Sequence, residues 1–229
     1  MEKELSGTVE DYLKAILNES FNSQAEYVSM TLLANRMKLT PGTVTTMAKR
    51  ISSEGWIDYK PREGCRLTEE GTKQALCLLR KHCLVESFLV KTLGMNWEDV
   101  HDEAEKIEHA LSDKVMKKLD EFLGLPEADP HGHPIFRSIA DYKNYNPVNL
   151  LSLAQAEEGK EYTISMVPEK NEHRPLLEYL RQHNLLPGTK IFIKNKNTGG
   201  GLIEIQTSEK DSIQIAISMG ELISLKANK

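Results

Sequence analysis

The sequence has few cysteines and no long apolar run. Its 229 residues include three cysteines, Cys65, Cys77 and Cys83, which form no CxxC pair. An odd number of scattered cysteines in a chain of this length argues against a disulfide framework and against a thiolate zinc site. No apolar stretch approaches the roughly 20 residues that a membrane-spanning helix needs. The acidic, polar N-terminus does not resemble a secretory signal, so we expect a cytoplasmic protein without membrane contact.

The chain also lacks a net positive charge. Its formal net charge is −5, which at first sight disfavours binding to nucleic acid. The distribution of the charges is more informative than their sum. Residues 36–66 hold seven Lys and Arg against three Asp and Glu, whereas residues 97–130 hold eleven Asp and Glu against four Lys. This polarity suits a protein that contacts phosphate at one place and binds a cation at another.

The first region, residues 1–74, begins with three predicted helices. Apolar residues at helical spacing predict an opening helix. Ser29 can cap a short second helix, and Thr40 can cap the third, with Pro41 at its first helical position. Gly55 can end this third helix.

A predicted hairpin follows the third helix. Residues 56–59 and 65–67 have the pattern of two short strands around a turn at 61–64. Three helices and a hairpin in this order predict a winged helix-turn-helix, in which the helix after the turn enters the major groove and the wing reaches the DNA backbone. Short threonines can meet phosphate or a thymine methyl, and basic side chains can meet phosphate. The candidate DNA contacts are Thr40, Gly42, Thr43, Thr45, Thr46, Lys49, Arg50, Lys60, Arg62 and Arg66.

The second region, residues 75–145, is predicted to contain two amphipathic helices. One apolar stripe runs from Leu76 to Leu89, and Gly94 ends that helix. A second helix is expected from Trp97 onward. Its apolar side would carry Val100, Ala104, Ile107, Leu111 and Val115. Two such helices do not bury both stripes by themselves, so we expect a helical dimerisation domain that packs against a second copy of the chain.

The third region, residues 150–229, is predicted to form a small SH3-like β-barrel. Its expected strands are 162–167, 190–193, 202–205 and 213–217, and one short helix is expected at 176–183. The stretch 141–147, rich in Asn, Tyr and Pro, is expected to be a linker. The fold class is therefore mostly α with a small β domain, in three successive domains.

Potential metal ligands gather in the second region. Glu105, Glu108 and His109 would lie on one face of a continuous helix. His101 is one turn earlier, and in the preceding helix His82 and Glu86 are four residues apart. Carboxylates and imidazoles on one turn suit a borderline-hard divalent ion. The alternative interpretation is a solvated acidic face with surface histidines. The absence of an HExxH motif disfavours a zinc enzyme.

At these residues the chain resembles the diphtheria toxin repressor family, and within it the manganese transport regulators. The motifs that carry the resemblance are Thr8–Leu13, Pro41–Val44, Leu67–Gly71, Arg80–His82, Val100–Ala104, Ile107–His109 and Asp129–Gly132. The resemblance covers most of the first 135 residues. The last 80 are similar only in pattern to the SH3-like, or FeoA-like, C-terminal domain of that family.

The resemblance implies two metal sites. The primary site would use Asp11, Glu105, Glu108 and His109, with His82 as a further ligand of this or the second site. Iron-responsive members carry a cysteine at the position of Glu105 and a methionine at that of Asp11. Hard oxygen ligands at both positions favour Mn(II) over the alternative, Fe(II). The second, ancillary site would use His82, Glu86 and His101, or Glu86, Asp129 and His131, as different members do. Ligand candidates from the C-terminal domain are Glu169, Glu172 and His173.

The resemblance implies a non-enzymatic transcription regulator, a repressor of metal-ion homeostasis. Bound Mn(II) would tie the first helix to the dimerisation region and hold two recognition helices at the spacing of a palindromic operator. Other divalent transition metals would substitute in vitro. Three alternatives remain at this point: a winged-helix sensor of an organic ligand, a metalloenzyme built on the same cluster, and a metal carrier. The basic wing and the Thr-rich helix argue against the carrier.

Overall fold

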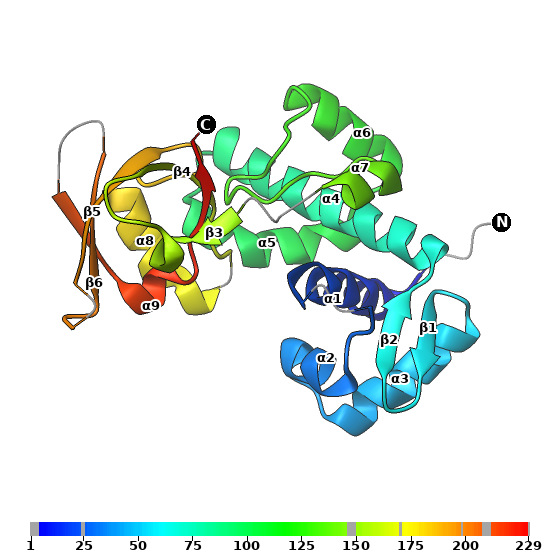
Figure 1. Ribbon diagram of the computed structural model, residues 1–229. Coiled ribbons are helices and arrows are strands. Elements are labelled where there is room, and N and C mark those ends of the chain that lie inside the picture. The colour runs from blue at the N-terminus through cyan, green and yellow to red at the C-terminus, as the bar shows by residue number, and fades with distance from the viewer. Residues whose placement is uncertain are drawn as a thin grey trace. The chain divides into compact units, whose positions relative to one another are not determined.

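The computed structural model of the chain is shown in Figure 1. It describes residues 5–23, 26–145, 150–169, 171–197, 199–207 and 212–228. The described residues form two compact units. The first runs up to Lys81 and includes Phe136–Lys143; the second consists of His82–Ile135 and the residues from Asn144 onward.

The first unit has the helices and the hairpin that the sequence predicts. Its elements are α1 (Gly7–Ser23), α2 (Met30–Met37), α3 (Pro41–Ser53), β1 (Ile57–Lys60), β2 (Gly64–Leu67), the start of α4 (Glu69–Lys91) and α7 (Ile139–Asn144). The predicted caps are confirmed, because Ser29 accepts a hydrogen bond from the backbone of Leu32, and Thr40 accepts one from Thr43. These side chains satisfy N–H groups that the helix itself leaves free, and so fix where α2 and α3 begin.

The hairpin is joined to the segment before α2. Strands β1 and β2 pair antiparallel, with Ile57 opposite Leu67. Val28 and Cys65 exchange backbone hydrogen bonds of 2.8 and 2.9 Å. Gly64 has φ of +135°, and a Cβ on it would lie 2.2 Å from the carbonyl oxygen of Val28. Only glycine permits this close approach, so the wing is held beside the helix-turn-helix.

The expected linker at residues 141–147 is in part helical, which corrects the sequence prediction. Helix α7 extends to Asn144 because its Tyr142 packs at 5.4 Å from Phe136 and at 6.3 Å from Phe21 of α1, measured between ring centroids. Aromatic contacts of this kind anchor a segment that composition alone marks as a loop. Residues 146 and 147 of the expected linker lie outside the described residues.

The helical part of the second unit is more broken than predicted. Helix α4 is followed by the 3-10 turn η1 (Trp97–Asp99), α5 (Val100–Ile107), a second 3-10 turn η2 (Glu108–Ala110) and α6 (Asp113–Phe122). The expectation of one helix from Trp97 through Val115 is wrong, because the side chain of Ser112 caps a new helix by accepting a hydrogen bond from Val115. Val100 and Ala104 are buried as predicted, but the exposed fraction of Val115 is 51%.

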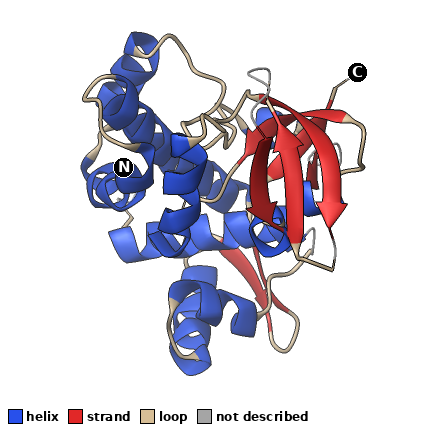
Figure 2. Cartoon of the chain, turned by 90° about the vertical axis from the view of Figure 1, so that its left-hand side faces the viewer, coloured by secondary structure: helices blue, strands red, loops and turns tan. Residues whose placement is uncertain are grey.

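The C-terminal part of the second unit is a six-stranded antiparallel sheet, drawn in red in Figure 2. The strands are β3 (Leu150–Ser152), β4 (Glu161–Met166), β5 (Lys190–Asn197), β6 (Leu202–Gln206), β7 (Ser212–Ala216) and β8 (Ser224–Ala227), in the order β3-β8-β4-β5-β6-β7. The four predicted strands are confirmed, whereas β3 and β8 were not predicted. Among the described residues β3 and β7 do not pair, so the SH3-like sheet is open rather than a closed barrel.

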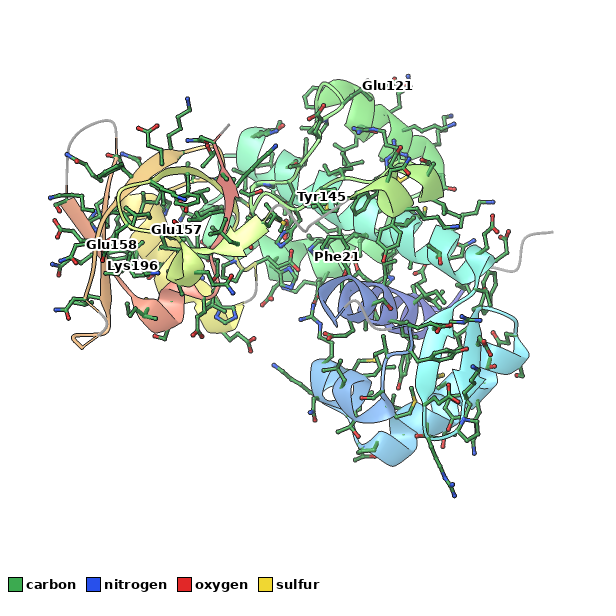
Figure 3. The ribbon with its side chains drawn as sticks, viewed as in Figure 1. Phe21, Glu121, Tyr145, Glu157, Glu158 and Lys196 are labelled. Carbon is green, nitrogen blue, oxygen red and sulfur yellow. The ribbon has the colours of Figure 1, made fainter. Side chains whose placement is uncertain are left out.

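Short helices and turns complete this sheet domain. They are η4 (Leu153–Gln155), η5 (Asn171–His173), α8 (Arg174–Gln182) and α9 (Ile217–Gly220). Lys196 of β5 donates from its ammonium group to the carbonyls of Ala154 and Ala156, at 2.6 and 2.7 Å, and its backbone N–H donates to Glu158 (Figure 3). These bonds fasten the segment before β4 to β5, and so help to fix β4, from which the functional site is partly built.

Two side chains join the helical part of the second unit to the sheet domain. Trp97 of η1 is 5% exposed and packs in the same apolar core as Leu177 of α8 and Ile193 of β5. Glu98 is 2% exposed, and Arg181 of α8 donates to both of its carboxylate oxygens. A buried carboxylate needs such a partner, so η1 and α8 are held together.

No helix in the described ranges has both the length and the apolar character to cross a membrane.

Candidate metal centre and DNA-contact face

The centre of the buried cluster is Glu86 on α4. Its side chain is fully buried, and its two oxygens point to different histidines. One oxygen, Oε1, lies 3.1 Å from Nε2 of His82 and 3.4 Å from Nδ1 of His101. The other, Oε2, lies 3.1 Å from Nδ1 of His131. Helix spacing explains the first of these contacts, because residues four apart on α4 share a face.

His131 belongs to a tight loop that the fold holds in one orientation. Oδ1 of Asp129 accepts hydrogen bonds from the backbone N–H groups of His131 and His133, at 2.8 and 2.9 Å. The His131 ring stacks on Trp97 with 5.6 Å between centroids, and its Nε2 lies 3.0 Å from the carbonyl oxygen of Trp97. Since that carbonyl only accepts, Nε2 carries the hydrogen. The other ring nitrogen, Nδ1, therefore faces Glu86.

The same loop is attached to the sheet domain. The backbone N–H of Val167 donates to the carbonyl of His131 at 2.9 Å. Gly132 has φ of +90°, and a Cβ on it would lie 1.9 Å from the carbonyl oxygen of Ser165 on β4. The close approach of loop and strand is possible because position 132 is glycine. It also brings Glu169, shortly after β4, to the cluster.

Glu169 is shared by two groups of side chains. In each group, one potential ligand atom per residue lies within 4.8 Å of all the others. The first group contains His82, Glu86, His101 and Glu169; the second contains Asp129, His131, His133 and Glu169. Nδ1 of His133 lies 3.2 Å from Oε2 of Glu169 and 3.4 Å from Oδ2 of Asp129.

The charges in the cluster balance one another without a metal. Burial alone would raise the pKa of Glu86, but His82 and the other imidazoles hold it well below its usual range. Burial likewise would raise the pKa of Glu169, and His133 outweighs it, so that the pKa is about 2. For His133, burial would lower the pKa, but Glu169 and Asp129 raise it to about 10. Protonated imidazoles therefore supply the positive charge that a bound cation would otherwise supply.

The donor atoms fit a hard or borderline divalent ion. Oδ2 of Asp129 and Nδ1 of His133 are buried atoms without a hydrogen bond in the described part of the chain, and they lie 3.4 Å from each other, so a cation could replace their ion pair. No cysteine belongs to either group among the described residues. Burial, and then the nearby Asp129 carboxylate, raise the pKa of Cys83, so this thiol stays protonated. Imidazole nitrogens and carboxylate oxygens suit Mn(II), Fe(II) or Zn(II).

The residues predicted for the primary site come from both units: Asp11 from the first, and Glu105, Glu108 and His109 from the second. Helix α5 ends at Ile107, so the expected helical face shared by Glu105, Glu108 and His109 is interrupted. Glu108 is buried, with Oε2 2.5 Å from Nδ1 of His82. Glu105 is instead exposed and lies 3.6 Å from Nε2 of His101. Asp11 is on α1 of the first unit, and its place in this site stays a prediction.

Two candidates from the C-terminal domain do not join the cluster. Glu172 and His173 lie in η5, with 3.5 Å between their charged groups, and neither belongs to either four-residue group. Of the three C-terminal candidates, only Glu169 is in the cluster. His133 was not predicted as a ligand. The sequence contains one signal for His133 as a ligand. Asp129, His131 and His133 alternate along the chain, and alternate residues of an extended loop can point the same way.

The candidate DNA contacts form an exposed stripe on α3. Its exposed members are Gly42, Thr43, Thr46, Lys49 and Arg50. Thr45 is half-buried and donates its hydroxyl to the carbonyl of Pro41. Thr40, at the cap, shares a hydroxyl contact with Thr43. Exposure at positions three and four apart gives α3 one face free to meet a groove.

The basic side chains of the first unit differ in how firmly they are held. Arg66 pairs with Glu26 and Asp58, and its guanidinium lies 4.9 Å from the ring centroid of Tyr27. Lys60 pairs with a neighbouring glutamate, and Arg50 with Glu54 at 3.1 Å. Arg62, at the tip of the wing, has φ of +71°. Single pairs this exposed cost little to break, so Lys60 and Arg50 remain readily available to phosphate, whereas Arg66 would have to leave two carboxylates.

Comparison with known proteins gives matches along most of the chain. Residues 4–65 match the N-terminal DNA binding domain of iron dependent repressors, residues 68–137 match their metal binding and dimerisation domain, and residues 151–226 match the FeoA domain. An uncharacterized HTH-type transcriptional regulator of Methanocaldococcus jannaschii is 38% identical over 120 residues, which are 52% of this chain and 94% of that protein.

Two further matches extend over nearly the full length. The iron-dependent repressor IdeR of Mycobacterium tuberculosis is 28% identical over 216 residues, covering 90% of this chain and 92% of IdeR. A solved structure of a manganese-dependent transcriptional repressor in complex with manganese is 28% identical and has a TM-score of 0.80. That alignment covers 96% of this chain and 100% of the other.

Proposed function

Because the chain belongs to the iron-dependent, or diphtheria toxin, repressor family of metal-dependent DNA-binding repressors, we propose that Mn(II) is the ion that activates it. Proteins of this family are transcription repressors rather than enzymes. The proposal adds to this membership the identity of the metal, the residues that bind it and the form in which the protein binds its operator.

The observation that carries the choice of metal is the donor set. The buried cluster offers imidazoles and carboxylates, and its nearest thiol, Cys83, stays protonated. The two primary-site positions that distinguish manganese from iron regulators hold Asp11 and Glu105. Mn(II) is low in the affinity series and prefers oxygen ligands, whereas a thiolate would favour softer ions. Likeness to a manganese-dependent repressor supports Mn(II), and likeness to IdeR supports Fe(II) as the alternative.

The residues predicted for the primary site come from two parts of the chain, so a cation bound by all of them would couple those parts. Asp11 belongs to the first unit, and Glu105, Glu108 and His109 belong to the second. A bound divalent ion would neutralise the repulsion between these carboxylates. Asp11 would then hold α1, and with it the helix-turn-helix, to the dimerisation domain. Operator binding should in turn strengthen metal binding, because coupling between two sites is reciprocal.

We further propose that the repressor acts as a homodimer through residues 75–125. The family's metal-binding domain is also its dimerisation domain. In this chain that domain exposes large apolar side chains, and a second copy would cover them. They are Leu93, Ile107, Val115, Phe122 and Leu125, with exposed fractions between 38% and 67%. The dimer presents two α3 helices, which suits a palindromic operator with half-sites one helical turn apart.

The test is a DNA-binding titration with each metal in turn. Duplexes are first selected from a random pool with Mn(II), Fe(II), Zn(II) or Co(II) present, and affinities are then measured by fluorescence anisotropy, with and without chelator. We expect tight, chelator-sensitive binding that Mn(II) supports at the lowest free concentration. Binding that survives chelation would refute metal activation, and a lower threshold for Fe(II) would replace Mn(II) as the signal.

The salt dependence of the same binding tests the DNA-contact face. Lys49→Ala should lower the slope of log affinity against log salt by about 1.8, because each subunit of the dimer loses one phosphate contact of about 0.9. Arg66→Ala is the matched control: its guanidinium is held by Glu26 and Asp58, so the slope should change much less. Equal slopes in wild type and in Lys49→Ala would remove Lys49 from the interface.

A further inference from the structure

We propose that the buried cluster binds two metal ions side by side, with Glu86 bridging them and His133 binding the second. The inference rests on the metal dependence proposed above but concerns the number of ions, which is measured without DNA. The residues of the first half-site are His82 and His101. Those of the second half-site are Asp129, His131 and His133. Glu169 lies within reach of both.

The first argument is the direction of the two Glu86 oxygens. Oε1 faces His82 and His101, whereas Oε2 faces His131. A carboxylate that binds one ion with both oxygens would direct them to the same place. Here they point to separate groups of imidazoles, which is the arrangement of a bridging carboxylate.

The second argument is the hydrogen on His131. Its Nε2–H donates to the carbonyl of Trp97 at 3.0 Å, so in the neutral ring Nδ1 is an acceptor. That acceptor lies 3.1 Å from Oε2 of Glu86, which also only accepts. The space between these two atoms therefore holds either a proton on Nδ1 or a metal ion, and a metal ion can displace that proton. A metal-binding histidine typically donates its other N–H to a carbonyl in this way, since the donation fixes the ring for binding.

The third argument is that two donor atoms of the second half-site make ion-pair contacts but no hydrogen bonds within the described part of the chain. Asp129 is 6% exposed, and its Oδ2 has no hydrogen-bond partner among the described residues. Nδ1 of His133 is also buried without a hydrogen bond there, and it lies 3.2 Å from Oε2 of Glu169 and 3.4 Å from Oδ2 of Asp129. Both atoms belong to a group whose potential ligand atoms lie within 4.8 Å of one another. Unsatisfied buried polar atoms are costly, and a bound cation satisfies both.

One ion does not use all these donors. Together the two groups contain seven side chains, and Glu169 is the one that they share. Glu86 of the first group also contacts His131 of the second group. Mn(II) is usually bound by about six donor atoms. Two ions that share Glu86 and Glu169 use every side chain of the cluster, which makes the two-ion arrangement the one that satisfies the donors.

The experiment counts ions by subtraction. Bound Mn(II) per chain is measured by equilibrium dialysis and elemental analysis for wild type, His101→Ala, Asp129→Asn and the double variant. If there are two ions, each single variant loses one and the double variant loses two, whatever the primary site binds. If one ion uses ligands from both half-sites, the double variant loses no more than either single variant, and the proposal is overturned.

The role of His133 is tested with a matched histidine. His133→Gln should weaken binding of the ion in the second half-site at least about tenfold, as loss of groups that bind or orient a metal does, and should leave the other ions unchanged. His183→Gln removes an exposed histidine of the same unit outside both groups and should change nothing. Identical binding curves for wild type and His133→Gln would exclude His133 as a ligand.

The bridge is tested by electron paramagnetic resonance. Two Mn(II) ions joined by carboxylates are magnetically coupled, and Glu86→Gln should reduce this coupling. Circular dichroism shows whether Glu86→Gln folds, and Glu86→Asp, which keeps both oxygens, should retain the coupling if it does not. Uncoupled spectra in the fully loaded wild type would refute a shared bridge. Repeating the ion counts with Co(II) distinguishes failure of one proposal from failure of the other. If the cluster bound two Co(II) ions but the protein bound no Mn(II), this would contradict Mn(II) as the signal and support the two-ion cluster.

Discussion

The buried cluster around Glu86 and the predicted primary site use similar side chains in opposite ways. Every residue of the cluster belongs to the second unit, and its donor atoms already face one another. The primary-site residues are divided between the two units, and Glu105 is exposed. A site that the fold assembles in advance can stabilise the fold, whereas a site that needs two units can report whether they are joined. We therefore expect stability to depend mainly on the cluster and operator affinity mainly on the primary site.

The largest effect should come from removing the centre of the cluster. Glu86→Ala should lower the free energy of unfolding of the metal-free protein by about 3 kcal/mol, because it leaves buried imidazoles without their carboxylate. Urea unfolding in chelator measures this. The control, Glu105→Ala, removes an exposed carboxylate and should stay within about 0.5 kcal/mol of wild type. Equal losses in the two variants would contradict the assignment of stability to the cluster.

Removing the one primary-site ligand in the first unit should break the coupling instead. Asp11→Asn should weaken Mn(II)-activated operator binding about 100-fold, as loss of a metal ligand or its partner typically does, while the unfolding free energy stays near that of wild type. Glu10→Gln makes the same charge change one residue earlier and should bind DNA normally. If Asp11→Asn binds the operator like Glu10→Gln, Asp11 is not part of the site.

Changing one primary-site donor should alter the choice of metal. Glu105→Cys should shift relative activation from Mn(II) toward Fe(II) or Zn(II) by about tenfold or more, because a thiolate prefers softer ions. Operator affinity is measured against each metal, with Glu103→Cys as a control on the same helix. Matching activation profiles for wild type and Glu105→Cys would show that Glu105 does not bind the metal, and the site would have to be redrawn.

The smallest effect concerns pH and the pair of His133 with Glu169. The pKa of Glu169 falls from 4.5 to about 2, so its contribution to stability is present above pH 4.5 and lost as the pH falls toward 2. The pKa of His133 rises from 6.5 to about 10, so its contribution is present below pH 6.5 and lost as the pH rises toward 10. With chelator present, the stability advantage of wild type over His133→Gln should therefore be largest between pH 4.5 and pH 6.5. A difference that does not vary with pH would contradict the pair.

Local signals predicted most of the fold. The caps at Ser29 and Thr40 and the four alternating strands are encoded by nearby residues, and the structure has them where they were expected. Strands β3 and β8 are only three and four residues long. Strand β3 pairs with β8, and β8 pairs with β4, so both strands depend on partners far away in the sequence that no local pattern predicts. The prediction of a second long helix failed because Ser112 caps α6. The prediction of a linker failed because Tyr142 packs on Phe21 of α1, which is far away in the sequence.

Helical spacing and family motifs predicted only part of the site. The pairing of His82 with Glu86 follows from spacing alone. His133 was missed because its partner Glu169 is 36 residues away, and only the attachment of the loop to β4 brings them together. Glu172 and His173 were equally plausible in sequence, yet η5 places them outside both groups.

The contact of Gly132 with β4 has a genetic consequence. A side chain at this position would collide with the carbonyl of Ser165, 1.9 Å from its Cβ, and would move the loop that carries His131 and His133. Every ligand would still be encoded, yet the cluster would be lost. In a screen for alleles that no longer respond to metal, substitutions of Gly132 should therefore have the same phenotype as substitutions of Asp129 or His131. Because the obstacle is a backbone carbonyl and Gly132 has φ of +90°, no change among the ligands would restore such an allele.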